Sequence, residues 1–363
     1  MKTLLRLLLK SQHPQNRSGR AQTEKGMTLI ELLIGTVMAF LIITPMLAFV
    51  VDMLNTDRRE QVKANTEQDI QAAVDFIAQD LSQAIYIYDN SADGVPALVT
   101  GKFIPSATTT NGTPILVFWK RQQLKNSLPI TAGDAPNTCT DSTPLTGAGA
   151  CNDSYVLSLV AYYQVSGGDA IWCQPSGGNT CPTRIVRYQI QDGLKNPTKS
   201  ADPDPAQRYF APTVLTDGQK LSKAFNIGDV NQQGFDISNP TKRVTMPNTS
   251  WERIDVLVNY LDHTELAAGP KVPVDECTIA LGNPTIQNGA ATEAILEGSL
   301  KIVGTERNSF YACVDTQKNL ARVTIRGNSL RRLQPNDANY DAKKSAFFPT
   351  ASVQVQGLGA RGK

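Results

Sequence analysis

Residues Leu32–Val51 form a long, mostly apolar run in which none of the twenty residues is charged. A helix rises about 1.5 Å per residue, so this run would cover roughly 30 Å, the thickness of the hydrocarbon core of a bilayer. A cleaved secretory signal is the alternative, but its apolar region is about 7–15 residues long and ends at a small-x-small site. The run is longer than that, and the MLAFVVDM string at its end offers no convincing site. We therefore predict a membrane-spanning helix.

The sequence that follows is polar but keeps a helical period. Its apolar residues recur at steps of four, three, four and four, at Ile70, Val74, Ile77, Leu81 and Ile85. These steps place one apolar stripe on one face of a helix. Because no glycine or proline occurs between Pro45 and Gly94, we predict a single helix from near Met27 to near Tyr88. Pro45 lacks an amide hydrogen and is expected to kink or locally melt it.

Beyond Gly94 the period changes from that of a helix to that of strands. Short β-branched and aromatic runs are separated by loops rich in Gly, Pro, Asn, Thr and Asp, which predicts an antiparallel β-rich domain. The predicted strands are Ile115–Trp119, Tyr155–Gln164, Arg184–Ile190, Arg253–Leu261, Leu300–Val303, Phe310–Val314, Leu320–Arg326 and Ser352–Gln356.

Charge is unevenly distributed along the chain. Before Met27 there are six basic residues and one acid, which gives this leader a charge of +5, whereas the whole chain carries +2. A basic segment ahead of an apolar run stays on the cytoplasmic side. We therefore predict a single-pass protein of the inner (cytoplasmic) membrane, with its N-terminus in the cytoplasm and its C-terminal domain in the periplasm. The charge balance does not indicate a nucleic-acid partner.

Six cysteines follow the apolar run, at Cys139, Cys151, Cys173, Cys181, Cys277 and Cys313. An even number within an exported domain predicts disulfides formed in an oxidising compartment. Three sequential pairs are the simplest connectivity, but six cysteines allow fifteen. Zinc binding is the alternative, and no CxxC pair or cysteine–histidine cluster supports it.

The stretch Lys25–Leu33, KGMTLIELL, resembles the signature of type IV prepilins, in which a basic leader ends in glycine before a TLIE string. Two details depart from the usual pattern: Met27 stands where phenylalanine is common, and the leader of 26 residues is long. The later blocks YVLSLVAYYQV, RIVRYQI, VLTDGQKLSKAFNI, ERIDVLVNYL and ARVTIRGNSLRR follow the order seen in minor pseudopilins of the J and W kind. Among these, the chain is most similar to the hormogonium polysaccharide secretion pseudopilin of filamentous cyanobacteria.

The resemblance implies an α+β fold, with a long N-terminal helix and a pilin-like antiparallel β-domain. The implied parts are a prepilin leader (1–26), a transmembrane and assembly helix (27–53), its amphipathic continuation (54–90) and a β-rich exported globular domain (94–363). It also implies that a prepilin peptidase cuts between Gly26 and Met27 and methylates the new amine of Met27. Glycine suits this step because it leaves the backbone accessible.

The implied function is that of a minor pseudopilin in a type IV pilus or type II secretion-like filament supporting polysaccharide secretion by a gliding motility apparatus. Its partners would be the prepilin peptidase, other pilins or pseudopilins through the N-terminal helix, the inner membrane and the secreted polysaccharide. The alternative is a minor type IV pilin that acts as an adhesin or glycan-binding tip subunit of an extracellular filament. Neither function is enzymatic, and neither implies a cofactor or metal.

Glu31 is an acid within the apolar segment, and two interpretations compete for it. An acid in the first turn of a helix interacts favourably with the helix dipole, by roughly 0.3–1 kcal/mol. Alternatively, Glu31 neutralises the N-terminal amine of an adjacent subunit during assembly. An unpaired carboxylate in a low-dielectric environment costs several kcal/mol, and such a pair removes that cost. Given the motif around it, we favour the assembly charge pair.

The other candidate residues are weaker. His263 and His13 are the only histidines, and neither lies beside a nucleophile motif. Asp202, Asp204 and Asp229 could bind calcium, but their spacing fits no ligand loop and favours a solvated turn. Four arginines, Arg322, Arg326, Arg331 and Arg332, are interpreted either as a strip facing an acidic polysaccharide or, preferably, as the wet face of an edge strand and its exit loop. The chain contains no GxGxxG, Walker or GxSxG motif, which disfavours a membrane enzyme.

Overall fold

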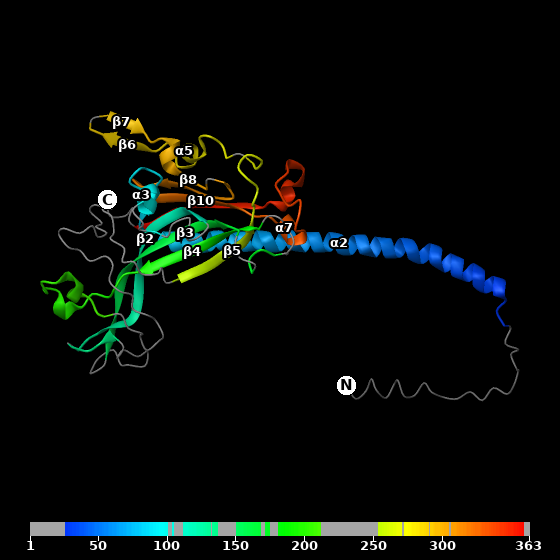
Figure 1. Cartoon of the computed structure of the whole chain (residues 1–363), viewed down its shortest axis with the longest axis horizontal. Helices are drawn as coiled ribbons and strands as arrows, with labels where there is room; N and C mark the ends of the chain where they lie inside the picture. The colour runs from blue at the N-terminus through cyan, green and yellow to red at the C-terminus, as the bar shows by residue number, and fades with distance from the viewer. Residues whose placement is uncertain are drawn as a thin grey trace, which may run out of the picture. The chain divides into compact units, whose positions relative to one another are not determined.

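The computed structural model describes residues 26–100, 104, 112–131, 133–136, 150–167, 171–174, 181–211, 253–270, 272–289, 291–304 and 306–358. The chain divides into two compact units, Met1–Arg58 and Arg59–Lys363. The elements are α2 (Leu29–Ser82), β1 (Ala84–Tyr88), α3 (Val95–Thr100), β2 (Gly112–Pro129), β3 (Cys151–Ser166), β4 (Thr183–Gln191), η2 (Pro197–Lys199), η3 (Pro205–Arg208), β5 (Arg253–Leu261), α5 (Glu276–Ala280), β6 (Thr285–Asn288), β7 (Ala291–Ala294), α6 (Glu297–Leu300), β8 (Lys301–Val303), β9 (Phe310–Asp315), β10 (Leu320–Arg326), α7 (Leu330–Leu333), η4 (Ala342–Phe347) and β11 (Thr350–Gln356) (Figure 1).

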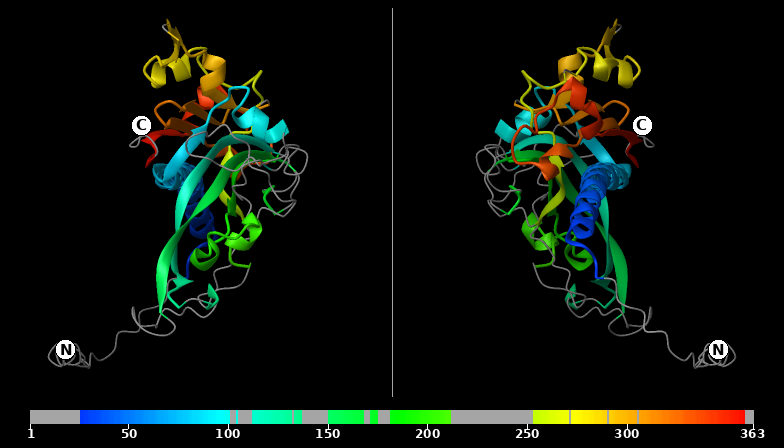
Figure 2. Two further views of the ribbon diagram at one scale, coloured as in Figure 1. Left: turned by 90° about the vertical axis from the view of Figure 1, so that its left-hand side faces the viewer. Right: turned by 90° about the vertical axis from the view of Figure 1, so that its right-hand side faces the viewer.

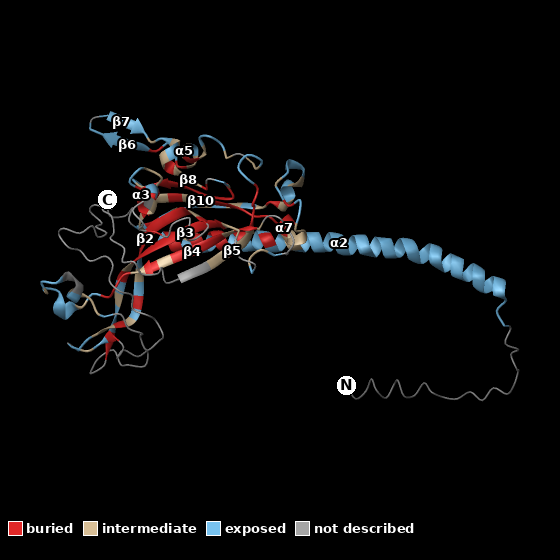
Figure 3. Cartoon of the chain, in the orientation of Figure 1, coloured by how far each residue is buried: buried red, intermediate tan, exposed pale blue. Residues whose placement is uncertain are grey.

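Helix α2 is continuous over 54 residues and stays α-helical through Pro45, so the local melting expected there does not occur. At 1.5 Å per residue the helix is about 80 Å long. The predicted apolar stripe is confirmed for Ile70, Val74, Ile77 and Leu81, which are at most 1% exposed. The helix therefore changes from exposed on every face in its first half to buried along one stripe in its second (Figure 3).

The predicted end of this helix near Tyr88 is wrong. The helix ends at Ser82, and Ala84–Tyr88 forms strand β1, which pairs antiparallel with β2. The β-branched and aromatic residues of AIYIY favour an extended chain, and pairing with β2 supplies the backbone hydrogen bonds that a further helical turn would have made. The pairing also brings the Tyr88 hydroxyl within 2.9 Å of the Trp119 indole nitrogen, which donates to it.

Two antiparallel sheets form the body of the β-rich domain, which confirms the predicted fold class. The larger sheet has the order β1-β2-β3-β4-β5, and the smaller has the order β11-β10-β9-β8. The eight runs that the sequence predicted as strands all coincide with or overlap observed strands. A single hydrophobic cluster joins the helix stripe to both sheets, so the second half of α2 is part of the domain core.

The close approach of helix and sheet depends on Gly327, which directly follows β10. A Cβ atom added there would lie 2.1 Å from Ile70 Cδ1 and 3.0 Å from Thr66 Cγ2. Both residues belong to α2 and are 1% exposed. A glycine is therefore needed at this point because the helix occupies the space of a side chain.

Strands β2 and β3 continue beyond the larger sheet as a two-stranded ribbon (Figure 2). Strand β4 pairs with β3 only as far as Ser158, whereas β2 and β3 remain paired to Pro129 and Cys151. A bulge lies between Leu124 and Leu128 in β2. For β2 the sequence predicted only the buried Ile115–Trp119, because the ribbon half of that strand, KRQQLKNSLP, is mostly polar. For β3 it predicted Tyr155–Gln164 of the observed Cys151–Ser166.

The hairpin formed by β6 and β7 was not predicted from the sequence. Its four-residue strands, TIQN and ATEA, are exposed throughout and contain few β-branched or aromatic residues. The available signal was the Asn288-Gly289 dipeptide, a typical hairpin turn. Gly289 has a φ of +65°, a conformation that glycine adopts without strain.

The sequence left the pairing of the six cysteines open. The structure contains two disulfide bridges among the described residues, Cys173–Cys181 and Cys277–Cys313. Cys151 is also disulfide-bonded, and Cys139 lies outside the described residues. The Cys277–Cys313 bridge ties α5 to β9 and belongs to a satellite hydrophobic cluster with Leu281 and Leu300.

Candidate assembly segment and surface pocket

The segment Gly26–Leu33 lies at the start of helix α2, and all its residues are exposed. Met27 is 75% exposed, and the helix begins two residues later at Leu29. A Cβ atom added to Gly26 would meet no atom within 4 Å. Nothing in the described fold therefore requires glycine at position 26.

Glu31 lies in the first turn of α2, where its backbone amide donates to the Thr28 carbonyl at 3.0 Å. Its carboxylate forms no hydrogen bond or ion pair within the described part of the chain. A basic partner for Glu31 would therefore come either from this chain outside the described residues or from another molecule.

The first half of α2 is long and apolar enough to span a membrane. Large apolar side chains from Met27 to Leu54 are 46–87% exposed. Two hydroxyls in this half are satisfied within the helix: those of Thr36 and Thr44 each donate to a backbone carbonyl one turn earlier, at 2.8 Å. Such internal satisfaction is what an apolar environment requires, because no water is available there.

The second half of α2 is fixed to the larger sheet by Asp80, a residue that the apolar pattern of the sequence did not single out. Asp80 is 7% exposed and lies 2.7 Å from Lys120 Nζ and 2.8 Å from Arg187 Nε. The Tyr162 hydroxyl donates to it at 2.7 Å. Burial by itself would raise the pKa of the Asp80 carboxyl, but the two cations hold it below its ordinary value of 3.8. The missed signal was that Asp80 follows Ile77 by three residues and therefore shares its face.

The four arginines of the predicted basic strip do not share one surface, so both interpretations of that strip are wrong. Strand β10 lies between β9 and β11 and is not an edge strand. Arg326 is 9% exposed and pairs with Asp262 at 2.8 Å, and Arg331 is 0% exposed. Arg332 pairs with Asp69 of α2. The counter-charges come from distant parts of the chain, which the spacing of the arginines could not reveal.

His263 is buried and directly follows Asp262, the partner of Arg326. The Nδ1 atom of His263 lies 3.3 Å from the Asn328 amide nitrogen. Burial lowers the pKa of His263 below its ordinary value, and the charges of Arg331 and Arg307 lower it further, against the opposing effect of Asp262. No serine or cysteine contact of the His263 ring occurs among the described residues. The arrangement is that of a structural histidine.

Asp202 and Asp204 lie in a turn, as the preferred interpretation predicted. The Asp202 carboxylate accepts the Asp204 amide hydrogen at 3.0 Å, and its carbonyl accepts from Arg208 Nε at 2.8 Å. Asp229 lies outside the described residues. In the described part of the chain, no three His, Cys, Asp or Glu side chains are grouped so that they could hold a metal ion.

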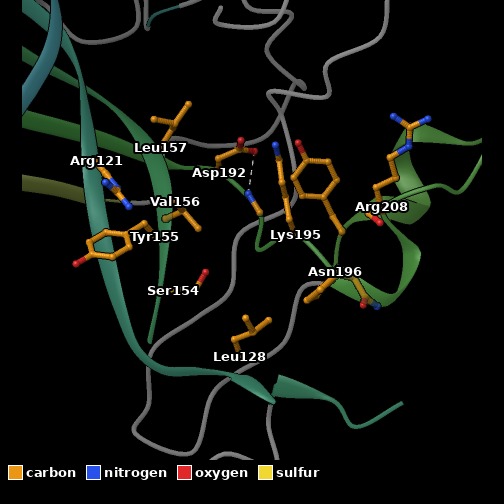
Figure 4. Close-up of a pocket in the computed structure, with 14 residues that line it drawn as sticks. Arg121, Leu128, Ser154, Tyr155, Val156, Leu157, Asp192, Lys195, Asn196 and Arg208 are labelled. Carbon is orange, nitrogen blue, oxygen red and sulfur yellow. Dashed lines mark hydrogen bonds between the residues drawn. The ribbon is translucent and has the colours of Figure 1, made fainter. Parts of the chain in front are cut away.

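A surface pocket of about 740 Å³, which the sequence analysis did not predict, lies beside the β2–β3 ribbon (Figure 4). Its other wall is residues 192–211, which fold back on themselves. The Phe210 amide donates to the Leu194 carbonyl at 2.9 Å, and Lys195 forms a β-bridge with Tyr209. The Asp192 amide donates to the Leu157 carbonyl at 2.9 Å and fixes this segment to the ribbon.

A small apolar cluster holds the two walls together. Leu124 and Val156 of the ribbon pack against Leu194, with Leu128 and Phe210 at its margin. Val156 and Leu128 also line the pocket, so its floor is apolar. The lining also contains Leu157, Gly193, Pro197 and Ser200, together with the charged, polar or aromatic residues Arg121, Ser154, Tyr155, Asp192, Lys195, Asn196, Arg208 and Tyr209. Because these residues come from separate polar stretches, the sequence pattern gave no sign that they meet.

Comparison of this chain with protein-family models, with curated proteins and with solved structures finds no match. The likeness to type IV pilins therefore depends on the sequence motif at the start of α2 and on the looser order of blocks that follows it.

Proposed function

We propose that this chain is a membrane-anchored minor pseudopilin, a subunit of a type IV pilus or type II secretion-like filament that supports polysaccharide secretion. In this proposal the first half of α2 anchors the subunit in the membrane and packs against neighbouring subunits in the filament. The second half of α2 carries the β-rich domain on the exported side of the membrane. The chain's role is assembly and mechanical support of export rather than catalysis.

The observation that carries the proposal is the position of GMTLIELL, residues Gly26–Leu33, at the exposed start of a long helix whose first half is apolar and whose second half joins a folded domain. The lack of contacts around Gly26 supports it further, because the glycine is not explained by the described fold. A peptidase that needs an unobstructed backbone does explain it. The Glu31 carboxylate has no partner among the described residues, which fits a contact completed by another subunit.

The test is the N-terminus of the protein extracted from its native membrane. Mass spectrometry should find a mature chain that starts at Met27 with a methylated amine. Gly26→Val should leave the uncut precursor in the membrane, because a branched side chain would block the approach of the peptidase. A mature chain that starts beyond Val51 would show an ordinary secretory signal and would contradict the proposal.

Gly35→Val provides the matched control. Gly35 lies in the same helix and, like Gly26, has no atom within 4 Å of an added Cβ. This variant should be cut and methylated as the wild type is. Equal loss of cutting in both variants would mean that the substitutions act on membrane insertion and not on the cleavage site.

A further inference from the structure

Three cationic side chains that line the surface pocket lack a carboxylate partner. Arg121, Lys195 and Arg208 form no ion pair among the described residues. The carboxylate in the lining, Asp192, is 5% exposed and accepts the Gly193 amide hydrogen at 2.8 Å. Three cations and one carboxylate give the lining a charge of +2.

This arrangement differs from that of the buried cations elsewhere in the domain. Lys120 and Arg187 share Asp80, and Arg326 pairs with Asp262. Those three buried cations are neutralised by carboxylates of the same chain. The pocket cations have no carboxylate partner among the described residues, so their positive field is available to a ligand.

The pocket also offers flat surfaces and neutral hydrogen-bonding groups. The Arg121 guanidinium lies 3.8 Å above the Tyr155 ring, and that ring is 51% exposed. Burial and the nearby Asp192 raise the pKa of Tyr209 to about 12, so its hydroxyl keeps its proton and can donate. The hydroxyl of Ser154 and the amide of Asn196 complete the polar lining.

We propose that this pocket binds an acidic oligosaccharide whose sugar rings carry carboxylates. Guanidinium and ammonium groups form charge-assisted hydrogen bonds with carboxylates, and the fork of Arg121 can make two in parallel. The apolar C–H face of a sugar ring packs on an aromatic ring such as Tyr155, and the hydroxyls of the sugar need donors and acceptors like those of Tyr209 and Asn196. A volume of about 740 Å³ lies within the range of small-molecule sites, about 300–1,000 Å³.

The inference rests on the proposed function for its biological role, because it identifies the class of polysaccharide that the filament would contact. The binding itself depends only on the pocket. A saccharide is favoured over an acidic peptide because the lining combines the exposed ring of Tyr155 with the neutral polar groups of Ser154 and Asn196, which sugar hydroxyls can use. An acidic peptide is nevertheless one arm of the test.

Binding is measured by titration calorimetry on the full chain purified in detergent. The probes are trigalacturonate, neutral maltotriose of the same length, and triglutamate. Trigalacturonate should bind most tightly, and its affinity should fall as salt is raised, because the contact is electrostatic. Lys195→Gln and Arg121→Gln should each raise its Kd about tenfold, the effect expected from losing one charge-assisted contact.

Two matched controls remove the same charge from the same elements. Lys199→Gln changes an exposed lysine of the segment that carries Lys195, and Lys125→Gln changes an exposed lysine of the strand that carries Arg121. Neither control residue lines the pocket. Both variants should bind trigalacturonate with the wild-type Kd.

Three results would overturn the inference: no binding of trigalacturonate at millimolar concentration, equal losses in pocket and control variants, or triglutamate binding as tightly as trigalacturonate. The last result would assign the pocket to an acidic peptide. Failure of binding in a chain that is still cut at Gly26 would reject this inference alone. Normal binding in a chain that is not cut there would reject the proposed filament function and leave the pocket assignment standing.

Discussion

A single carboxylate, Asp80, determines how helix α2 sits on the larger sheet. It contacts side chains from three consecutive strands, Lys120 of β2, Tyr162 of β3 and Arg187 of β4. Apolar stripes tolerate small shifts along a sheet, but a buried charge with three polar partners fits in one position only. The cluster therefore sets the register of the helix, whereas Ile70, Ile77 and their neighbours supply its apolar contacts with the core.

Asp80→Asn should lower the free energy of unfolding by about 3–5 kcal/mol, because it leaves two buried cations without their counter-charge. Chemical unfolding of the detergent-purified chain measures this change. Asp75→Asn, an exposed position on the same helix, should change it by less than about 0.5 kcal/mol. Equal effects in the two variants would show that Asp80 contributes no more than a surface acid.

The lowered pKa of Asp80 also predicts how the free energy of unfolding depends on pH. Because the folded pKa of Asp80 is lowered, its contribution is fully present above the ordinary value of 3.8 and is lost as the pH falls toward the folded value. The stability difference between wild type and Asp80→Asn should therefore be constant near neutral pH and should shrink in acid. A difference that stays constant to pH 2 would contradict this assignment.

At the scale of elements, the sequence predicted the stripe of α2 and eight strands but misplaced the junction between helix and sheet. Ile85 continues the helical period by chance, because in a strand the alternation of AIYIY also places apolar residues on one face. The two periods agree over so few residues that only pairing with β2 decides between them. A single residue, Gln83, separates the end of the helix at Ser82 from the start of the strand at Ala84.

Gly327→Ala should destabilise the domain by about 1–3 kcal/mol, because the new methyl group would overpack the contact with Ile70. Ile70→Val alone should cost about 0.5–1.5 kcal/mol through lost burial. Combined, the two changes should cost less than their sum, since the shorter side chain makes room for the methyl group. Urea unfolding of the four proteins measures the coupling. Strict additivity would mean that the helix and Gly327 are not in the contact described.

At the scale of the whole molecule, the sequence was sufficient to predict the fold class. The surface pocket and the buried ion pairs could be identified only in the structure. The long apolar run and the change of period after Gly94 predicted a helix followed by an antiparallel β-domain, because both signals are local. The pocket escaped prediction because Arg121, Tyr155 and Lys195 lie in separate polar stretches. The pairing of Arg326 with Asp262, 64 residues away, escaped for the same reason.

Glu31→Gln tests assembly at this scale. If Glu31 only interacts with the helix dipole, the change costs less than about 1 kcal/mol and assembly is normal. If Glu31 pairs with the amine of a neighbouring subunit in a dry interface, the loss is about 3–5 kcal/mol per contact. We expect a chain that is cut and membrane-anchored but does not co-purify with its partner subunits after crosslinking in the cell.

Asp52→Asn is the control for this experiment, because it removes an exposed acid at the opposite end of the apolar run. Partner recovery and polysaccharide secretion should be normal in that variant. Normal recovery and secretion in Glu31→Gln as well would return this residue to the role of a favourable charge at a helix N-terminus.

The short junction between α2 and β1 has a consequence for force. A pull along the helix reaches the β-rich domain through Asp80, bonded to three strands, and through β1, which begins only four residues later. The contacts of Asp69 and Ile70 lie nearer the start of the helix and take the load first. Because the Asp80 and β1 attachments are adjacent and both engage the larger sheet, tension that passes those contacts must rupture the ion pairs and shear the β1–β2 ladder together. The helix and the sheet would therefore act as one stiff tether.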